Sequence, residues 1–440
     1  MPPHPRFREA LRFWLKLGFI SFGGPAGQIA IMQTELVERR RWIGQERFLH
    51  ALNFCMLLPG PEAQQLAIYC GWLLHRTWGG IVAGVLFVLP AAFLLWGLAW
   101  LYMTHGNVPW IAAVFSGLKP AVLAIVVAAV LRIGGKALRN RAMWGVAATA
   151  FALLFFGVAP FPVVVLGALA AGLIGGRLAP QLFVPASGGH GDGSAGAVKP
   201  VRGAVIQDAA ESASVRPSWG RALKVMVIGG GLWASPLLAI GFWQGWDGTL
   251  ARMGFFFSKA AMVTFGGAYA VLPYVGQQAV DNFGWLTAPQ MLDGLALAET
   301  TPGPLIMVLQ FVGFAGAWGQ PGGLSPLVAA TLGAALTTWV TFAPCFIWIF
   351  LGAPHIERLR SVKILTAALA TVTAAVVGVV LNLAVWFGWH ALVPAADWTR
   401  PDGFALAVAV AAFTALHRFK ANMFAIIASC AALGLLWNAC

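Results

Sequence analysis

Charged residues are scarce in this sequence. Asp, Glu, Lys and Arg together make up 10% of its 440 residues, whereas hydrophobic residues make up 59%. An ordinary globular domain is about a quarter charged. Four stretches contain no charged residue at all: 78–104, 142–176, 225–246 and 300–354. Because a bilayer-spanning helix needs about 20 predominantly apolar residues, this distribution excludes a soluble globular protein and predicts an all-α polytopic membrane protein.

Cysteine and histidine are also few, with five and eight residues respectively. The cysteines form no C-x-x-C pair and the histidines are scattered, so the sequence shows no ligand set for a metal or a haem. It also shows no nucleotide-binding motif. We therefore expect no cofactor and no enzymatic activity.

The formal net charge is +13, which in a soluble protein would suggest a nucleic-acid partner. This chain has no soluble basic domain that could bind nucleic acid, so we expect no such partner. Its basic residues instead gather between the apolar stretches, as they do in the cytoplasmic loops of membrane proteins. The partner that the composition predicts is the lipid bilayer.

A polar segment divides the chain. Residues 181–220 are rich in Gly, Ser, Ala and Pro and show no apolar periodicity, which is typical of a flexible linker. The linker separates an N-terminal membrane half, residues 1–180, from a C-terminal half, residues 221–440. The apolar segment 225–246 predicts one extra helix before the second set.

The two halves repeat each other. The pairs that lie 243 residues apart are Lys16 and Lys259, Phe22-Gly23-Gly24 and Phe265-Gly266-Gly267, and Pro59-Gly60-Pro61 and Pro302-Gly303-Pro304. After a short insertion the spacing becomes 254 residues, which relates Pro90 to Pro344. Internal symmetry of this kind is typical of transporters.

Lys and Arg are distributed oppositely in equivalent loops. The basic loops are 35–47, 132–141 and 355–363, and their counterparts without Lys or Arg are 278–290, 386–395 and 101–109. Because Lys/Arg-rich loops stay in the cytoplasm, equivalent loops lie on opposite sides and the repeat has inverted topology. The same rule places the N-terminus and the linker in the cytoplasm and the C-terminus in the periplasm.

Glycine and proline interrupt several apolar segments. Residues 17–33 lie between two basic segments and are too few for two full spans, so we predict a re-entrant hairpin broken at Gly23-Gly24-Pro25. The same reasoning gives four hairpins, at 17–33, 48–75, 260–277 and 291–318. About four spans follow in each half, at 79–103, 108–131, 142–158 and 161–176, and at 327–353, 364–388, 403–416 and 421–437.

Broken helices at membrane depth leave backbone N–H groups that only protein or a water-filled cavity can satisfy. The N-terminus of a half-helix favours an anion, so we predict that the breaks of both halves form a cradle for a small oxyanion. Each single motif is also explained by close helix packing, but four breaks at equivalent positions favour a binding site. The candidate residues are Phe22, Gly23, Gly24, Pro25, Pro59, Gly60, Pro61, Phe265, Gly266, Gly267, Pro302, Gly303 and Pro304, with Thr300 and Thr301 as added hydroxyl donors.

Ionisable residues within apolar segments add a second group of candidates, because each is costly at membrane depth. Lys119 lies near the middle of a predicted span, where it either faces the anion pathway or pairs with a buried carbonyl or carboxylate. Gln64 is a candidate neutral ligand or a packing amide. Four residues are candidates for coupling or gating, with interface anchoring and helix capping as alternatives: Lys16, Glu62, Lys259 and Glu299.

These segments resemble the chromate transporter (CHR) family. The resemblance rests on the two Phe-Gly-Gly segments, the two Pro-Gly-Pro segments and the run Gly-Pro-Glu-Ala-Gln-Gln-Leu-Ala at 60–67, and it covers both halves, as in the family's two-domain form. It implies a multi-pass protein of the bacterial inner membrane that exports chromate and confers chromate resistance, with sulfate as a structural analogue. The repeat departs from symmetry where Gly267-Ala268 matches Gly24-Pro25 and Leu305 matches Glu62, which favours the first-half site.

The leading interpretation is a secondary transporter that works by alternating access. An anion channel, a carrier of sulfate or a related oxyanion, and an intramembrane enzyme such as a chromate reductase are the alternatives. Outward movement of a dianion down an inside-negative potential releases about 2 × 2.3 kcal/mol per 100 mV, so export requires no proton. The sequence does not decide between a monomer and a homodimer.

Overall fold

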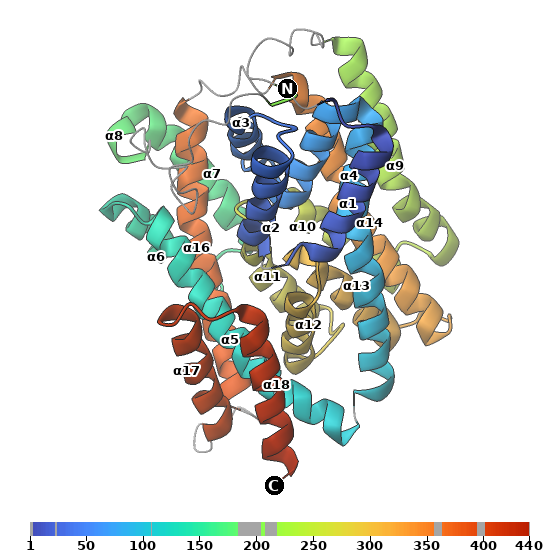
Figure 1. The fold of residues 1–440 in the computed structure, drawn as a ribbon. Coiled ribbons are helices and arrows are strands. Elements are labelled where there is room, and N and C mark those ends of the chain that lie inside the picture. Colours follow the sequence, from blue (N-terminus) through green and yellow to red (C-terminus); the bar gives the residue numbers. More distant parts are fainter. Residues whose placement is uncertain are drawn as a thin grey trace.

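The chain folds into a bundle of helices in the computed structural model (Figure 1). The structure describes residues 3–22, 24–106, 108–183, 204–206, 218–355, 363–393 and 401–439. These residues form no β-strand beyond one isolated bridge between Ile43 and Ile206. Within this described part of the chain, six helices are long and apolar enough to cross a membrane, which confirms the prediction of an all-α polytopic membrane protein.

The first half contains two short broken segments followed by longer helices. Its elements are α1 (Phe7–Ile20), α2 (Gly24–Gln33), the π-helix η1 (Thr34–Arg39), α3 (Gln45–Cys55), α4 (Glu62–His105), α5 (Pro109–Ala137), α6 (Arg141–Phe155), α7 (Phe161–Leu178) and α8 (Pro180–Phe183). Within α4 the backbone leaves the helical conformation at His75 and Arg76, so α4 consists of two helices that meet at a kink. This kink lies where the second predicted hairpin ends.

The second half follows the same order after the additional helix α9 (Trp219–Gln244). Its elements are α10 (Thr249–Met262), α11 (Ala268–Gln277), the π-helix η3 (Gln278–Asn282), α12 (Ala288–Thr300), η4 (Leu305–Met307), α13 (Val308–Gly319), α14 (Pro326–Gly352), η5 (Ala353–His355), α16 (Lys363–Leu392), α17 (Gly403–His417) and α18 (Met423–Ala439). A π-helix thus follows the second short helix in both halves. Local signals fix several starts: Asn140 accepts from the Met143 N–H at α6, and Thr287 and Gln290 form a capping box at α12.

The observed bounds differ from the predicted ones at the first hairpin of each half. Helix α1 begins at Phe7, not near residue 17, and α10 begins at Thr249, not near residue 260. In α1 the charged residues lie on exposed faces while Phe13, Trp14 and Leu17 are buried. The sequence pattern placed the charged residues in a loop, whereas an amphipathic helix accommodates them. The extra helix α9 begins at Trp219 instead of residue 225.

The last two long helices of each half pack against the other half. Helices α6 and α7 contact α16, while α17 and α18 contact α5. Helices α5 and α16 contact each other with opposite directions, because the Cβ position of Gly134 faces Val377 and that of Gly388 faces Leu123. The repeat relates the two contacts, because Gly134 and Gly388 are equivalent residues 254 apart, as are Leu123 and Val377.

The predicted linker, 181–220, lies mostly outside the described residues. One described part of it, residues 204–206, pairs with the loop after η1: Val205 N–H donates to Arg41 O at 3.0 Å, and Gly44 N–H donates to Ile206 O at 3.0 Å. Ala204 and Ile206 are buried. This piece of the linker and the basic loop 35–47 therefore lie on the same side of the molecule.

Candidate functional site

Four helix breaks interrupt the short segments that Figure 1 shows in the middle of the bundle. They lie between α1 and α2, between α3 and α4, between α10 and α11, and between α12 and η4. Each coincides with a Phe-Gly-Gly or Pro-Gly-Pro segment at which the sequence predicted a break. Gly23, one of the candidate residues, lies outside the described residues. Pro25 lies in the first turn of α2, where proline is favoured.

The breaks of the two halves are joined by an exchanged pair of backbone hydrogen bonds. The Gly60 N–H donates to Thr264 O at 2.8 Å, and the Gly303 N–H donates to Ser21 O at 2.7 Å. Gly60 and Gly303 are equivalent in the repeat, as are Ser21 and Thr264. The two glycines also share an unusual backbone, with φ of +112° and +108°. Each Pro-Gly-Pro segment is therefore fastened to the Phe-Gly-Gly segment of the other half.

This arrangement differs from the expectation that the central N–H groups of the Pro-Gly-Pro segments bind an anion. Both N–H groups already donate a hydrogen bond to a backbone carbonyl of the opposite half. The space is also filled: a Cβ on Gly60 would lie 3.0 Å from Cys345 Sγ, and one on Gly303 would lie 2.4 Å from Ala91 Cβ. Pro59, Gly60 and Pro61, with Pro302, Gly303 and Pro304, thus act as packing joints in this conformation.

Two glutamines reinforce the joints. The side-chain amide of Gln65 donates to Pro59 O at 2.7 Å. That of Gln28 donates to Gly303 O at 2.5 Å and approaches Ser21 O at 3.4 Å. Buried amides that bond to backbone carbonyls hold a chain segment in place. The four breaks are consequently joined in two pairs inside the bundle, each held by one backbone hydrogen bond and one glutamine side chain.

Space remains at the Phe-Gly-Gly segments. A Cβ built on Gly24 or on its equivalent Gly267 would meet no atom within 4 Å, although Gly267 is buried. The φ angles are +69° and +97°. Among the described residues, the backbone N–H groups of Phe265, Gly266 and Gly267 have no hydrogen-bond partner. These groups precede the N-terminus of α11, where the helix dipole favours an anion.

The first-half break carries a further unpartnered polar group. Ser21 is completely buried, and its hydroxyl has no hydrogen-bond partner in the described part of the chain. An unsatisfied buried hydroxyl is costly and indicates a polar ligand or a bound water nearby. The Phe22 ring packs edge-on against Phe424 of α18, with ring centroids 4.8 Å apart. The last helix of the second half thus borders the first-half break.

Thr300 and Thr301 do not supply free donors in this conformation. The Thr300 hydroxyl donates to Leu297 O at 2.8 Å and the Thr301 hydroxyl donates to Ala298 O at 3.1 Å. Both therefore satisfy carbonyl groups at the C-terminal end of their own helix, α12. The expectation that they add donors to the cradle is not met here.

Lys119 pairs with a carboxylate, which is the second of the two roles predicted for it. Its Nζ lies 3.6 Å from Asp293 Oδ2, which also accepts a hydrogen bond of 2.8 Å from the Tyr102 hydroxyl. The Asp293 side chain is 5% exposed and that of Lys119 30% exposed. This cluster joins α4 and α5 of the first half to α12 of the second.

The two candidate glutamates have different surroundings. Glu299 is buried and accepts a hydrogen bond of 2.5 Å from the Tyr269 hydroxyl, and Arg132 acts on it electrostatically. Glu62 is the first residue of α4 and is partly exposed. The dipole of α4 stabilises a carboxylate at this position, which agrees with the capping role considered for Glu62.

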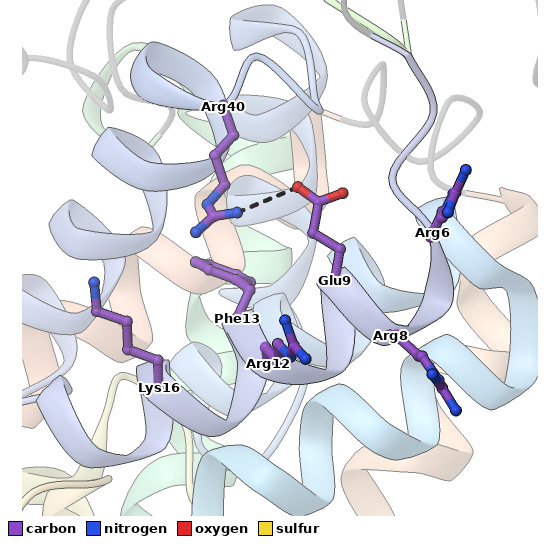
Figure 2. Close-up of a pocket in the computed structure, with 7 residues that line it drawn as sticks. All are labelled: Arg6, Arg8, Glu9, Arg12, Phe13, Lys16 and Arg40. Carbon is purple, nitrogen blue, oxygen red and sulfur yellow. Dashed lines mark ion pairs between the residues drawn. The ribbon is translucent and has the colours of Figure 1, made fainter.

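Lys16 and Lys259 are exposed and lie on helices that precede the breaks, not at the breaks themselves. Figure 2 shows Lys16 on a basic face of α1 with Arg8 and Arg12, next to Arg40, whose guanidinium lies 3.6 Å from a Glu9 carboxylate oxygen. These residues border a surface pocket of about 420 Å³. Such a face attracts anions but does not place Lys16 in the cradle.

Gln64 is buried, and its amide nitrogen approaches Gly84 O at 3.4 Å. Its amide oxygen has no partner among the described residues. An unpartnered acceptor does not favour an anion, so the packing role predicted as the alternative fits the geometry better.

Sequence reasoning missed several polar residues of this region. They are Ser21, Gln28, Tyr102, Thr264, Tyr269 and Asp293. Ser21 and Thr264 carried a visible signal, because a hydroxyl residue directly precedes Phe-Gly-Gly in both halves. Asp293 is a charged residue in a largely apolar helix that also contains Glu299, and a charge at membrane depth is a functional signal.

Comparison with known proteins gives consistent matches. The sequence model described as "Chromate transporter" matches residues 8–175 and 251–435. The chromate transport protein of Pseudomonas aeruginosa is 33% identical over 383 residues, which cover 86% of this chain and 80% of the relative. The chromate transport protein of Cupriavidus metallidurans is 28% identical over 435 residues, or 98% of this chain and 94% of the relative.

A shorter relative matches only part of the chain. The uncharacterized transporter YwrB of Bacillus subtilis is 28% identical over 160 residues, which are 36% of this chain and 79% of the relative. No solved structure matches. The two matched segments, the full-length relatives and the long apolar helices show that this multi-pass membrane protein belongs to the chromate transporter family.

Proposed function

We propose that the protein is a secondary transporter that exports chromate, a tetrahedral divalent oxyanion, across the bacterial inner membrane and so confers chromate resistance. The observation that carries the proposal is the exchanged pair of hydrogen bonds between the breaks of the two halves. Each bond joins the Pro-Gly-Pro segment of one half to the start of the Phe-Gly-Gly segment of the other, where residues 265–267 hold free N–H groups and Gly24 and Gly267 adjoin unfilled space. The family membership and the names of the relatives support chromate as the substrate.

The two halves form an inverted-topology repeat in this proposal. Three kinds of contact occur twice, each time with the equivalent residues of the two halves interchanged. They are the hydrogen bonds of Gly60 and Gly303, the packing of these glycines against Cys345 and Ala91, and the contacts between α5 and α16. A pseudo-two-fold axis explains such exchange, and an inverted repeat rocks about a fixed site to expose it alternately to each side. The relative that matches only 160 residues of this chain supports a single half as a structural unit.

The substrate site in this proposal is built mainly from backbone N–H groups. Phe265, Gly266 and Gly267 supply donors at the start of α11, and Ser21 supplies a buried hydroxyl. Donors without a fixed countercharge suit a dianion that must be released again after each transport step.

The orientation of the protein in the membrane follows the distribution of Lys and Arg in its loops, with the N-terminus and the linker in the cytoplasm and the C-terminus in the periplasm.

Replacing Gly24 by asparagine is expected to lower chromate uptake into inside-out membrane vesicles at least tenfold while the protein still inserts. The side chain would enter the open space at the first-half break. Asparagine tolerates the left-handed backbone of this residue, so folding should be preserved. The matched control is Gly157→Asn, because Gly157 has a similar φ of +66° and open space but lies in the exposed turn between α6 and α7. Equal uptake by both variants would exclude the break as the substrate site.

A further inference from the structure

A large, mostly apolar groove runs between α4, α9 and α14, and its lining also includes Gln64, near the Pro59-Gly60-Pro61 break, and Gln310 of α13. Its volume is about 1130 Å³, which slightly exceeds an ordinary small-molecule pocket. On α4 it extends from Thr77 to Trp96, and on α14 from Thr331 to Phe350. At a rise of 1.5 Å per residue this is roughly 28 Å, close to the thickness of a bilayer's hydrocarbon core.

The walls of the groove are apolar along most of their length. Their side chains include Val85, Leu89, Phe93, Ile228, Phe342 and Phe346. Helix α9 contacts the rest of the protein mainly through α14 and α10, and Figure 1 shows it at the outer edge of the bundle. The groove therefore borders the region where lipid surrounds the protein.

All charge in the groove is positive and lies at one end. Arg221 and Lys224, one helical turn apart at the start of α9, line it together with Phe350. Among the described residues that line the groove, none is Asp or Glu. Lys224 is exposed and forms no ion pair within the described part of the chain.

The position of Arg221 indicates a missing anionic partner. One of its terminal nitrogens donates to Phe350 O at 3.0 Å, while the other, Nη1, is buried without a partner. Its guanidinium lies 5.9 Å from the centre of the Trp72 ring, and that of Arg76 lies 5.7 Å from the same ring. The two like charges repel each other, and a bound anion would relieve this repulsion.

We propose that the groove binds one anionic phospholipid, whose acyl chains lie along α4, α9 and α14 and whose phosphate contacts Arg221 and Lys224. The apolar walls fit the acyl chains, and the paired charges at the cytoplasmic end fit the headgroup. Basic pockets between transmembrane helices on that side bind anionic headgroups in the same manner. The bound lipid would hold the peripheral helix α9 against both halves.

The test compares lipid binding to purified protein by native mass spectrometry and by thermal stabilisation, with phosphatidylglycerol and phosphatidylcholine of identical chains. Phosphatidylglycerol is expected to bind preferentially. Arg221→Gln together with Lys224→Gln should weaken that binding roughly 30-fold, and Lys224→Gln alone about fivefold. The second variant changes an exposed side chain, so it keeps the fold intact.

The control is Lys136→Gln with Arg177→Gln, which removes the same charge from exposed positions elsewhere and should leave lipid binding unchanged. Equal binding of both lipids would overturn the proposal, as would unchanged binding by the Arg221 and Lys224 variants. Equal stabilisation by inorganic phosphate alone would show a phosphate site instead of a lipid site.

Discussion

Replacing Gly303 by alanine is expected to remove most of the folded protein from the membrane and to abolish chromate transport. The new methyl group would lie 2.4 Å from Ala91 Cβ, and the backbone has a φ of +108° that alanine rarely adopts. Overpacking and backbone strain together cost about 2–6 kcal/mol. That is a large part of the stability of an ordinary domain, and the strained residue also donates the bond to Ser21 O.

The midpoint of thermal unfolding in detergent and the amount of inserted protein measure this effect. Gly97→Ala is the control, because Gly97 lies within α4 and its Cβ would meet no atom within 4 Å. Normal stability of the Gly303 variant would show that the Pro-Gly-Pro joint is not tightly packed, which would contradict the described contact between the halves.

The second large effect is expected for Lys119→Met. This change leaves the carboxylate of Asp293 buried without its cation, and removing one partner of a buried ion pair costs about 3–5 kcal/mol. Asp293→Asn should cost less, because Lys119 is 30% exposed and its ammonium can reach water. Tyr102 can still donate to the asparagine oxygen.

A double-mutant cycle separates this pair from other effects. The combination of Lys119→Met with Asp293→Asn should be more stable than Lys119→Met alone, since no charge remains buried. Unfolding in detergent and the yield of inserted protein are the measurements. If the loss of stability in the double variant equalled the sum of the losses in the two single variants, a direct interaction between the two side chains would be excluded.

The sequence predicted the helix breaks well because glycine and proline act locally. A Pro-Gly-Pro or Phe-Gly-Gly segment ends a helix whatever surrounds it, and the breaks at Gly24, Gly60, Gly267 and Gly303 all lie where the repeat placed them. The long spans were equally predictable, because apolar length is a local property of the sequence.

The partners of these segments were not predictable, because they lie far away in the chain. Gly60 donates to a carbonyl of the second half and Gly303 to one of the first, so N–H groups expected to bind an anion instead bind backbone carbonyls of the opposite half. The partner of Lys119 is likewise in the other half. The start of α1 was missed for a different reason: charged residues on its exposed face resembled a loop.

The described conformation also explains how a polar centre exists with few charges. The breaks satisfy each other through backbone groups and two glutamines, and unpartnered N–H donors remain at the described residues Phe265, Gly266 and Gly267. Because a free N–H group needs no countercharge, such donors remain available at membrane depth. A substrate that brings two negative charges would be bound by these donors and the helix dipole.

Transport of labelled chromate by the purified protein in liposomes tests the central claim most directly, with membrane potential and pH gradient set separately. We expect chromate to accumulate on the positive side, chemically unchanged, with competition by sulfate. The dependence on potential should approach two charges, about 4.6 kcal/mol per 100 mV, and turnover should be that of a carrier, not a channel. Absence of protein-dependent flux, or recovery of reduced chromium, would contradict an oxyanion transporter.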